Sequence, residues 1–135
     1  ALLTPGIEVV DRPQDISGDK ASTESALLHA LEVMEERKGY TYDAVVTLQA
    51  TSPLRRAETV KACFNQYEQD RDKYDALLTL TETRTDYWIK EGENHYRRLY
   101  PDAPRRRQDR DPIYIENSAV YITDRQSLLD TGSVL

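Results

Sequence analysis

Residues 43–55 read DAVVTLQATSPLR, and this stretch decides the predicted fold. Its first part, residues 43–48, is a short apolar run with β-branched residues, which is typical of a strand inside a parallel sheet. The second part is a polar loop, and ligands of open α/β sheets bind at the carboxyl ends of the strands. The loop is therefore a candidate binding segment, although Gln, Thr, Ser and Pro also make an ordinary turn and helix start. The polar side chains that it offers are Gln49, Thr51, Ser52, Arg55 and Arg56.

Helices are expected on both sides of this strand. Hydrophobic residues recur at helical spacing over residues 23–38 and again over residues 56–69. Ser22 has the side chain of a helix N-cap, and Gly39 can adopt the left-handed conformation that ends a helix. Both segments therefore predict amphipathic helices.

Two further apolar runs predict strands over residues 7–10 and 75–80. Pro13 stops the first of them because proline cannot continue a hydrogen-bonded ladder. Three strands are thus separated by two helices, and each crossover is long enough to return along the sheet. This order predicts parallel pairing with right-handed connections, so the expected fold class is α/β.

The chain changes character in residues 82–112, which are polar and interrupted by glycine and prolines. Short strands are expected at residues 87–89 and 95–96, without a helix between them. This segment is therefore predicted to be an insertion and not another strand and helix unit.

Strand pattern returns at residues 113–115 and 119–122, and Asp124 is placed to cap a last helix that runs through Leu129. The chain has 135 residues and 39% hydrophobic content, which suffices for one core and is too little for two, so residues 1–135 are expected to form a single domain. The sequence opens without Met and stops just after a predicted helix. We therefore expect part of a larger domain to be missing at both ends.

The formal net charge of −6 at pH 7 argues against nucleic acid or an anionic membrane as the main partner. No apolar stretch approaches the roughly 20 residues needed to cross a bilayer, and the start lacks the features of a signal peptide. The single cysteine, Cys63, cannot form an internal disulfide and fits a reducing compartment. These features predict a soluble, cytoplasmic protein with no nucleic-acid and no membrane partner.

Charge is distributed unevenly along the chain. Six arginines and two aspartates fall within residues 97–110, a formal +4 in a chain of −6. The planar guanidinium binds a carboxylate or phosphate through two hydrogen bonds, so this basic segment suits an anionic ligand. The alternative is an exposed, salt-bridged surface, which is common for runs of charge. Arg107 and Gln108 are the favoured pair for binding because they lie next to predicted strands.

Other reactive side chains are expected to be structural. Cys63 lies on the apolar face of a helix and is interpreted as core packing, not as a nucleophile. His29 and His95 have no partner at metal-ligand spacing, so no zinc site is expected. The sequence contains no visible Ser-His-Asp arrangement, glycine-rich phosphate loop or carboxylate pair for acid and base catalysis.

Four blocks stand out along the chain: EVVDRP at residues 8–13 with SGD and AST at residues 17–23, LQATSPLR at 48–55, RQD at 107–109 and NSAVYI at 117–122. In this order and spacing they resemble the blocks of the acylneuraminate cytidylyltransferases, which make CMP-activated sialic acid and related nine-carbon sugars. Enzymes that activate the eight-carbon acid Kdo resemble the chain less, because they carry a different block close to VQGDEP.

The resemblance implies a Rossmann-like, three-layer nucleotidyltransferase sheet that is mainly parallel. It implies a reaction in which the anomeric hydroxyl of a sialic-acid-like sugar attacks the α-phosphate of CTP and releases pyrophosphate, with Mg²⁺ as cofactor. It also implies a homodimer in which the insertion, residues 82–112, reaches the partner subunit. The family's site residues fall here on Arg12, Ala21 and Thr23 for the nucleotide, on Gln49, Thr51, Ser52, Asn117 and Tyr121 for the sugar acid, and on Arg107 and Gln108 for catalysis.

The chain also departs from the family. Ala50 stands where the family has proline, and Ser118 stands where a glycine follows the asparagine, which adds a Cβ. The family's N-terminal loop around the triphosphate and its C-terminal aspartate block for magnesium are absent, so the chain offers no metal ligands. We therefore expect a truncated domain with impaired activity. The alternatives are a non-catalytic module or degenerate paralogue that binds a nucleotide sugar or sugar acid, and an unrelated anion-binding α/β domain.

Overall fold

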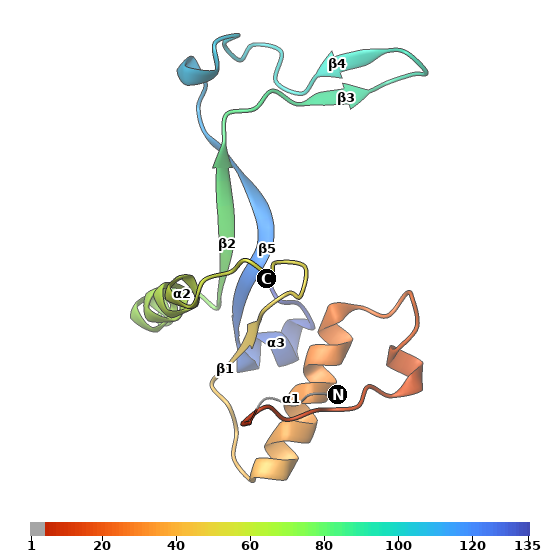
Figure 1. Ribbon diagram of the computed structural model, residues 1–135, viewed down its shortest axis with the longest axis vertical. Coiled ribbons are helices and arrows are strands. Elements are labelled where there is room, and N and C mark those ends of the chain that lie inside the picture. The colour runs from red at the N-terminus through yellow and green to blue at the C-terminus, as the bar shows by residue number, and fades with distance from the viewer. Residues whose placement is uncertain (1–4) are drawn as a thin grey trace. The chain divides into compact units, whose positions relative to one another are not determined.

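The computed structural model describes residues 5–135, so the first four residues of the predicted domain lie outside the described part. Its helices and strands belong to the α/β class. In chain order they are α1 (Thr23–Lys38), β1 (Ala44–Thr47), α2 (Ala57–Asp70), β2 (Ala76–Thr83), β3 (Trp88–Lys90), β4 (Tyr96–Arg98), β5 (Ile113–Asp124) and α3 (Arg125–Thr131), with 3₁₀ turns at Gln14–Ile16 and Arg107–Asp109 (Figure 1).

The chain divides into two compact units. The first unit contains the residues up to 78 together with residues 118–135, and the second unit is residues 79–117. β2 and β5 each pass from one unit into the other. The first unit is therefore discontinuous in sequence, while the second is a continuous stretch that contains the β3–β4 hairpin.

The sheet has the strand order β1, β5, β2. β1 pairs antiparallel with β5, so that Ala44 lies opposite Asp124 and Thr47 lies opposite Tyr121. The N–H of Asp124 donates to the carbonyl of Asp75 at 2.7 Å, which places the start of β2 beside the end of β5. The prediction that β1 and β2 pair directly and in parallel is therefore wrong. β5 lies between them, and its partners are too distant in sequence for local patterns to identify.

Residues 7–10 do not form the predicted strand. They are extended without a neighbouring strand, and side chains of α1 hold the carbonyls of this part of the chain. Arg37 donates to the carbonyl of Val9 at 3.1 Å, and a ring nitrogen of His29 lies 3.2 Å from the carbonyl of Asp11. The predicted strand is therefore wrong, because this segment contacts side chains of α1 and pairs with no strand in the described part of the chain.

The core of the first unit forms where α2 packs on β5. Tyr67 of α2 is buried against Val120 and Ile122, which are fully enclosed. Cys63 and Leu77 are half-buried and pack against the same cluster. The interpretation of Cys63 as a packing residue is confirmed, and burial raises the pKa of its thiol.

The predicted helix boundaries agree with the structure to within two residues. The Ser22 hydroxyl accepts the N–H of Ser25 at 3.1 Å, and Gly39 ends α1 with a φ of 72°. Asp124 caps α3 by accepting the N–H groups of its second and third residues. The two strands predicted between the insertion and this cap are a single strand, β5.

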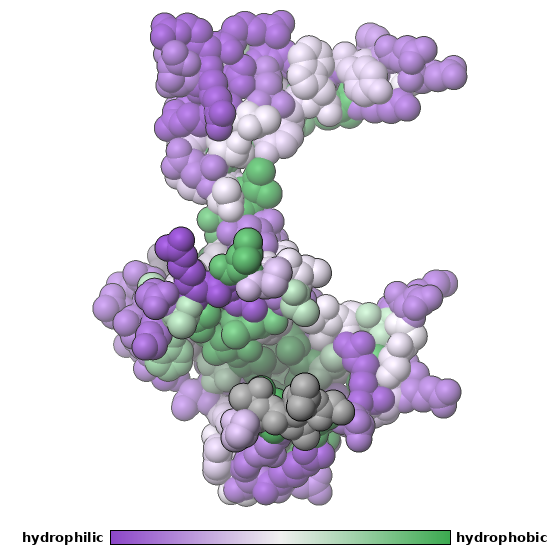
Figure 2. Space-filling model, viewed as in Figure 1, coloured by the Kyte–Doolittle hydropathy of each residue, from purple (hydrophilic) through white to green (hydrophobic). Residues whose placement is uncertain are grey.

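Hydrophobic surface is exposed on the first unit (Figure 2). β1 is an edge strand of the sheet, and a groove runs between it and α1. The groove is lined by Leu27, Ala30, Leu31, Met34, Tyr42, Ala44, Val45 and Val46.

None of the helices within residues 5–135 combines the length and the apolar character needed to cross a bilayer.

An ion pair joins α1 to α3. The Arg125 guanidinium donates to both carboxylate oxygens of Glu35, with distances of 2.6 and 2.9 Å. Glu35 also accepts the N–H of Tyr42 at 3.0 Å, and the N–H of Arg125 donates to the carbonyl of Asp43 at 3.0 Å. The hydrogen bond from Arg125 lowers the pKa of Glu35 to about 2.

This low pKa gives the first unit a specific acid sensitivity. The ion pair contributes stability above the unfolded pKa of about 4.5 and loses it as the pH falls toward 2. We expect Glu35→Gln to lower the melting temperature by a few degrees at pH 7, and the gap from the unmodified chain to close between pH 4.5 and 2. Thermal melts across this pH range measure the effect. Glu36→Gln removes the same charge from the exposed neighbour, and an equal response of both variants would contradict the assignment.

Candidate functional site

The loop that follows β1 consists of two successive turns. The N–H of Ser52 donates to the carbonyl of Gln49 at 3.2 Å, and the N–H of Arg55 donates to the carbonyl of Ser52 at 3.3 Å. Pro53 lies within the second turn, where its fixed φ suits the backbone. Gln49 and Ser52 are half-buried and Thr51 is exposed, so the predicted polar side chains lie in a turn at the surface of the first unit.

Arg55 connects this loop to β5. Its guanidinium donates to the carbonyl of Gln49 from two nitrogens, at 3.1 and 3.3 Å, and to the carbonyl of Ala119 at 2.6 Å. The sequence indicates Arg55 as one of the polar side chains that the loop offers to a ligand. In the structure, three of its donors are occupied by main-chain oxygens.

The part of β5 held by Arg55 contains the predicted residue Tyr121. Its backbone lies opposite Thr47 at the end of β1, and its hydroxyl donates to the Ser118 hydroxyl at 3.1 Å. Gln49 and Tyr121 therefore lie at the same end of the β1–β5 pair, together with Thr51 and Ser52. The Ser118 backbone has a φ of 54°, a left-handed conformation that favours glycine. The position where the resembling family has glycine is thus a position that requires positive φ.

The residues predicted for the nucleotide lie before and at the start of α1. Arg12 is exposed, and its carbonyl accepts the hydroxyl of Ser17 at 3.1 Å. The N–H of Ala21 closes a turn on the carbonyl of Gly18 at 2.9 Å, and Thr23 is the first residue of α1. This loop is held by its own backbone and leaves the Arg12 guanidinium without a hydrogen bond or ion pair in the described part of the chain.

Three predicted site residues belong to the second unit. Arg107 and Gln108 are exposed in a 3₁₀ turn. Asn117 binds two hydroxyls of β2: its oxygen accepts from Thr79 at 2.7 Å, and its nitrogen donates to Thr81 at 3.0 Å. The side chain of Asn117 therefore holds β5 to β2, whereas the Arg107 guanidinium makes no hydrogen bond or ion pair within residues 5–135.

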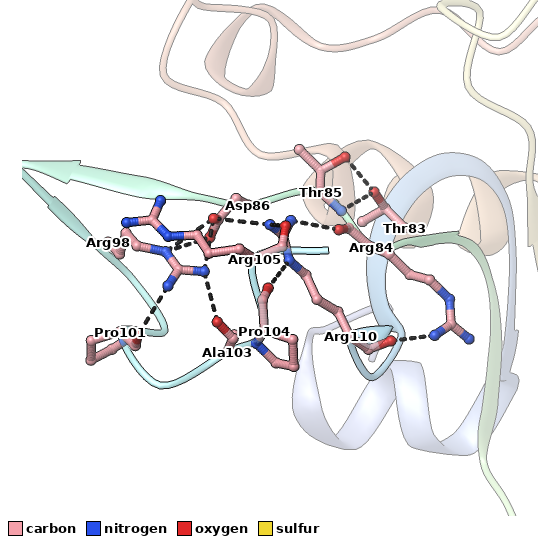
Figure 3. Close-up of polar contacts among 10 residues, drawn as sticks. All are labelled: Thr83, Arg84, Thr85, Asp86, Arg98, Pro101, Ala103, Pro104, Arg105 and Arg110. Atoms are coloured by element: carbon pink, nitrogen blue, oxygen red, sulfur yellow. Dashed lines mark hydrogen bonds and ion pairs between the residues drawn. The ribbon is translucent and has the colours of Figure 1, made fainter. Parts of the chain in front are cut away.

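An aspartate that the sequence interpretation missed organises the second unit. Asp86 accepts from Arg98 at 3.0 and 3.2 Å, and lies 3.2 Å from a nitrogen of Arg110 (Figure 3). The hydrogen bond from Arg98 lowers the pKa of Asp86, and the charge of Arg110 acts in the same direction. The sequence carries no direct signal for this residue, because Asp86 precedes the basic segment and the burial of Arg98 depends on tertiary contacts.

Arg98 and Arg110 also donate hydrogen bonds to main-chain carbonyls (Figure 3). Arg98 donates to Pro101 and Ala103, and Arg110 donates to Arg84, Pro104 and Arg105. Within the basic segment, Arg97 pairs with Glu91 and Arg106 with Asp109. Arg105 and Arg107 are the arginines of this segment whose side chains have no such partner among the described residues. The second unit also holds a cavity of about 360 Å³ lined in part by Arg84, Asp86, Tyr100 and Arg110.

Possible metal ligands are dispersed among the described residues. Within residues 5–135, no three His, Cys, Asp or Glu side chains are grouped so that they could hold a metal ion. Asp86 and Glu35 are engaged by arginines, and Asp124 is engaged by the start of α3. Mg²⁺ often binds one or two carboxylates together with substrate phosphates, a mode that does not require a cluster of three ligands.

Several curated proteins with the name cytidylyltransferase are similar to the chain in sequence. No family model matches the chain. N-acylneuraminate cytidylyltransferases of Streptococcus agalactiae serotype V and of Escherichia coli are 27% identical to it over 129 residues, which cover 94% and 93% of this chain. A pseudaminic acid cytidylyltransferase of Campylobacter jejuni is 24% identical over 124 residues and 84% of this chain. These relatives share the name cytidylyltransferase.

The chain is therefore distantly similar to the acylneuraminate cytidylyltransferases, the family that the four blocks indicate, and this resemblance is confirmed. The matched region spans only 30% of the length of the S. agalactiae protein and 52% of that of the C. jejuni protein. The chain therefore corresponds to only part of each of these enzymes, and the candidate site residues can be compared with that part alone.

The left-handed backbone of Ser118 can be tested by substitution. Ser118→Ala and Ser118→Gly both lose the hydrogen bond from Tyr121, but only glycine adopts a φ of 54° without a steric cost. We expect the glycine variant to be more stable than the alanine variant by about 1 kcal/mol. Urea unfolding measures the difference, and an alanine variant of equal or greater stability would show that the position is not strained.

Proposed function

We propose that this chain is part of a cytidylyltransferase that transfers CMP from CTP to a sialic-type nonulosonic acid. The observation that carries the proposal is the junction made by Arg55. It joins the LQATSPLR loop to the NSAVYI segment, two of the blocks that the chain shares with the family. Relatives with the name N-acylneuraminate cytidylyltransferase match over nearly the whole chain and support the same activity.

In the proposed reaction, the anomeric hydroxyl oxygen of the sugar acid forms a bond to the α-phosphorus of CTP. The bond from that phosphorus to the bridging oxygen of the β-phosphate breaks, pyrophosphate leaves, and the hydroxyl proton is released. Catalysis of this type of transfer consists mainly of positioning the reactants and stabilising negative charge. Free guanidinium and amide groups are the chemical means for both tasks.

The proposed roles follow the resemblance. Arg12 and Arg107 have unengaged guanidinium groups, which supports a role in binding phosphate or carboxylate. The polar turn after β1 supports binding of the hydroxylated sugar. We propose that Arg12, Ala21 and Thr23 bind the nucleotide, that Gln49, Thr51, Ser52, Asn117 and Tyr121 bind the sugar acid, and that Arg107 and Gln108 contact the reacting groups.

The proposal also covers the metal, the cellular compartment and the oligomeric state. We propose that Mg²⁺ enters the site bound to the phosphates of CTP, and no step of the reaction is assigned to it. We propose a cytoplasmic homodimer that uses the second unit. Large side chains of the hairpin support an interface there, because Trp88 and Tyr96 are 52% and 55% exposed and aromatic residues are common interface anchors.

Pyrophosphate release tests the activity directly. We expect the chain to release pyrophosphate from CTP with magnesium and N-acetylneuraminic acid, at a rate well below that of full-length enzymes, because it spans a fraction of its relatives' length. Omission of the sugar acid should abolish the release. A folded chain that binds CMP-sialic acid without any turnover would instead be a binding module, and a folded chain with neither property would contradict the proposal.

Arg107 provides a test of the binding role that does not need turnover. We expect CMP-sialic acid to raise the melting temperature of the chain, and Arg107→Ala to abolish most of this rise. The ligand-free melting temperature should change little, because the side chain makes no contact that stabilises the fold. Arg105→Ala is the matched control, since it removes an equally exposed charge two residues away. An equal ligand response of the two variants would remove Arg107 from the site.

A further inference from the structure

Arg55 is half-buried, and its guanidinium is bound by main-chain oxygens instead of by a carboxylate. It makes no ion pair within residues 5–135, and its three hydrogen bonds go to the carbonyls of Gln49 and Ala119. Taking a guanidinium partly out of water costs free energy that hydrogen bonds must offset. The useful property of Arg55 is therefore the arrangement of its N–H donors, and not its positive charge alone.

The two carbonyls belong to segments that continue beyond Thr47 and Tyr121, the last pair of the β1–β5 register. One lies in the turn after β1, where the Gln49 carbonyl also accepts the N–H of Ser52. The other lies in β5, next to the left-handed Ser118. The Nη1 nitrogen of Arg55 donates to both oxygens, and Nη2 adds a second hydrogen bond to the Gln49 carbonyl. The planar guanidinium holds these donors in a fixed arrangement, which the single nitrogen of a flexible lysine side chain cannot reproduce.

We infer that Arg55 is a positioning residue, which sets the spacing between the Gln49–Ser52 turn and the Ser118–Tyr121 segment. The consequence for substrate rests on the proposed function, because these are the segments proposed to bind the sugar acid. Three of the five N–H donors of Arg55 are bound to carbonyl oxygens of the chain, so the inferred role is to hold these two segments and not to bind the substrate. Its role is to hold the turn and β5 in register before the ligand arrives, which lowers the ordering cost of binding.

The neighbouring arginine provides a matched control. Arg56 is exposed, adjacent in sequence and of the same charge, and its side chain does not cap α2. Arg56→Ala therefore removes equal charge from the same loop without removing the hydrogen bonds to Gln49 and Ala119. Arg55→Lys keeps the charge at the original position and removes the fork, so it separates geometry from electrostatics.

The first experiment needs no ligand. Hydrogen exchange followed by NMR reports on the Ser52 amide, which is bonded inside the turn. We expect exchange at this amide to be at least about tenfold faster in Arg55→Ala and clearly faster in Arg55→Lys, relative to β5 core amides in the same sample. Arg56→Ala should leave the rate unchanged. Unchanged exchange in both Arg55 variants would overturn the inference. The lysine variant serves if the alanine variant does not fold.

The second experiment measures affinity for CMP-sialic acid by calorimetry. We expect binding about tenfold weaker in Arg55→Ala and in Arg55→Lys, equivalent to about 1.4 kcal/mol, and within twofold of the original in Arg56→Ala. Full affinity in Arg55→Lys would overturn the inference, because charge alone would then suffice. If the unmodified chain does not bind CMP-sialic acid, the proposed function fails. The exchange experiment alone then tests whether Arg55 sets the spacing between the two segments.

Discussion

The antiparallel pairing of β5 with β1 is the interaction on which the rest of the first unit depends. It brings Val120 and Ile122, which are fully enclosed, onto Tyr67 of α2. Each such aliphatic side chain contributes on the order of 2 kcal/mol by leaving water, which offsets the entropy of closing a loop that contains α2, β2 and the entire second unit. The same pairing carries Tyr121 to the end of β1. β5 therefore contributes residues both to the core and to the candidate site.

The sequence predicted those parts of the fold that depend on local chemistry. Ser22 and Asp124 were identified as helix caps because their side chains satisfy N–H groups a few residues away, a relation visible within one turn of chain. Helix boundaries followed from the same logic. The strand at residues 7–10 and the parallel pairing failed because an extended segment does not specify its neighbour. α1 holds the first segment, and β5 separates β1 from β2.

The candidate site shows the same division. Its segments could be located from sequence, because polar turns that follow apolar strands are recognisable. Which polar groups are free could not be predicted, because hydrogen bonds between distant residues decide it. Asn117 is occupied by Thr79 and Thr81, and Arg55 by two carbonyls. Counting arginines overestimates the charge that is free to meet a ligand. In the basic segment most guanidinium groups serve the fold.

β1 also gives this chain a liability in solution. It forms one border of the sheet with the uncharged residues Ala44–Thr47, which include neither lysine nor proline. A border of this kind is a template for adding a strand from another molecule. The added strand would also bury the apolar groove beside β1. Mutual repulsion from the net charge of −6 opposes the approach of two molecules, and salt screens that repulsion. Ionic strength and protein concentration are therefore expected to control the association of this chain through β1.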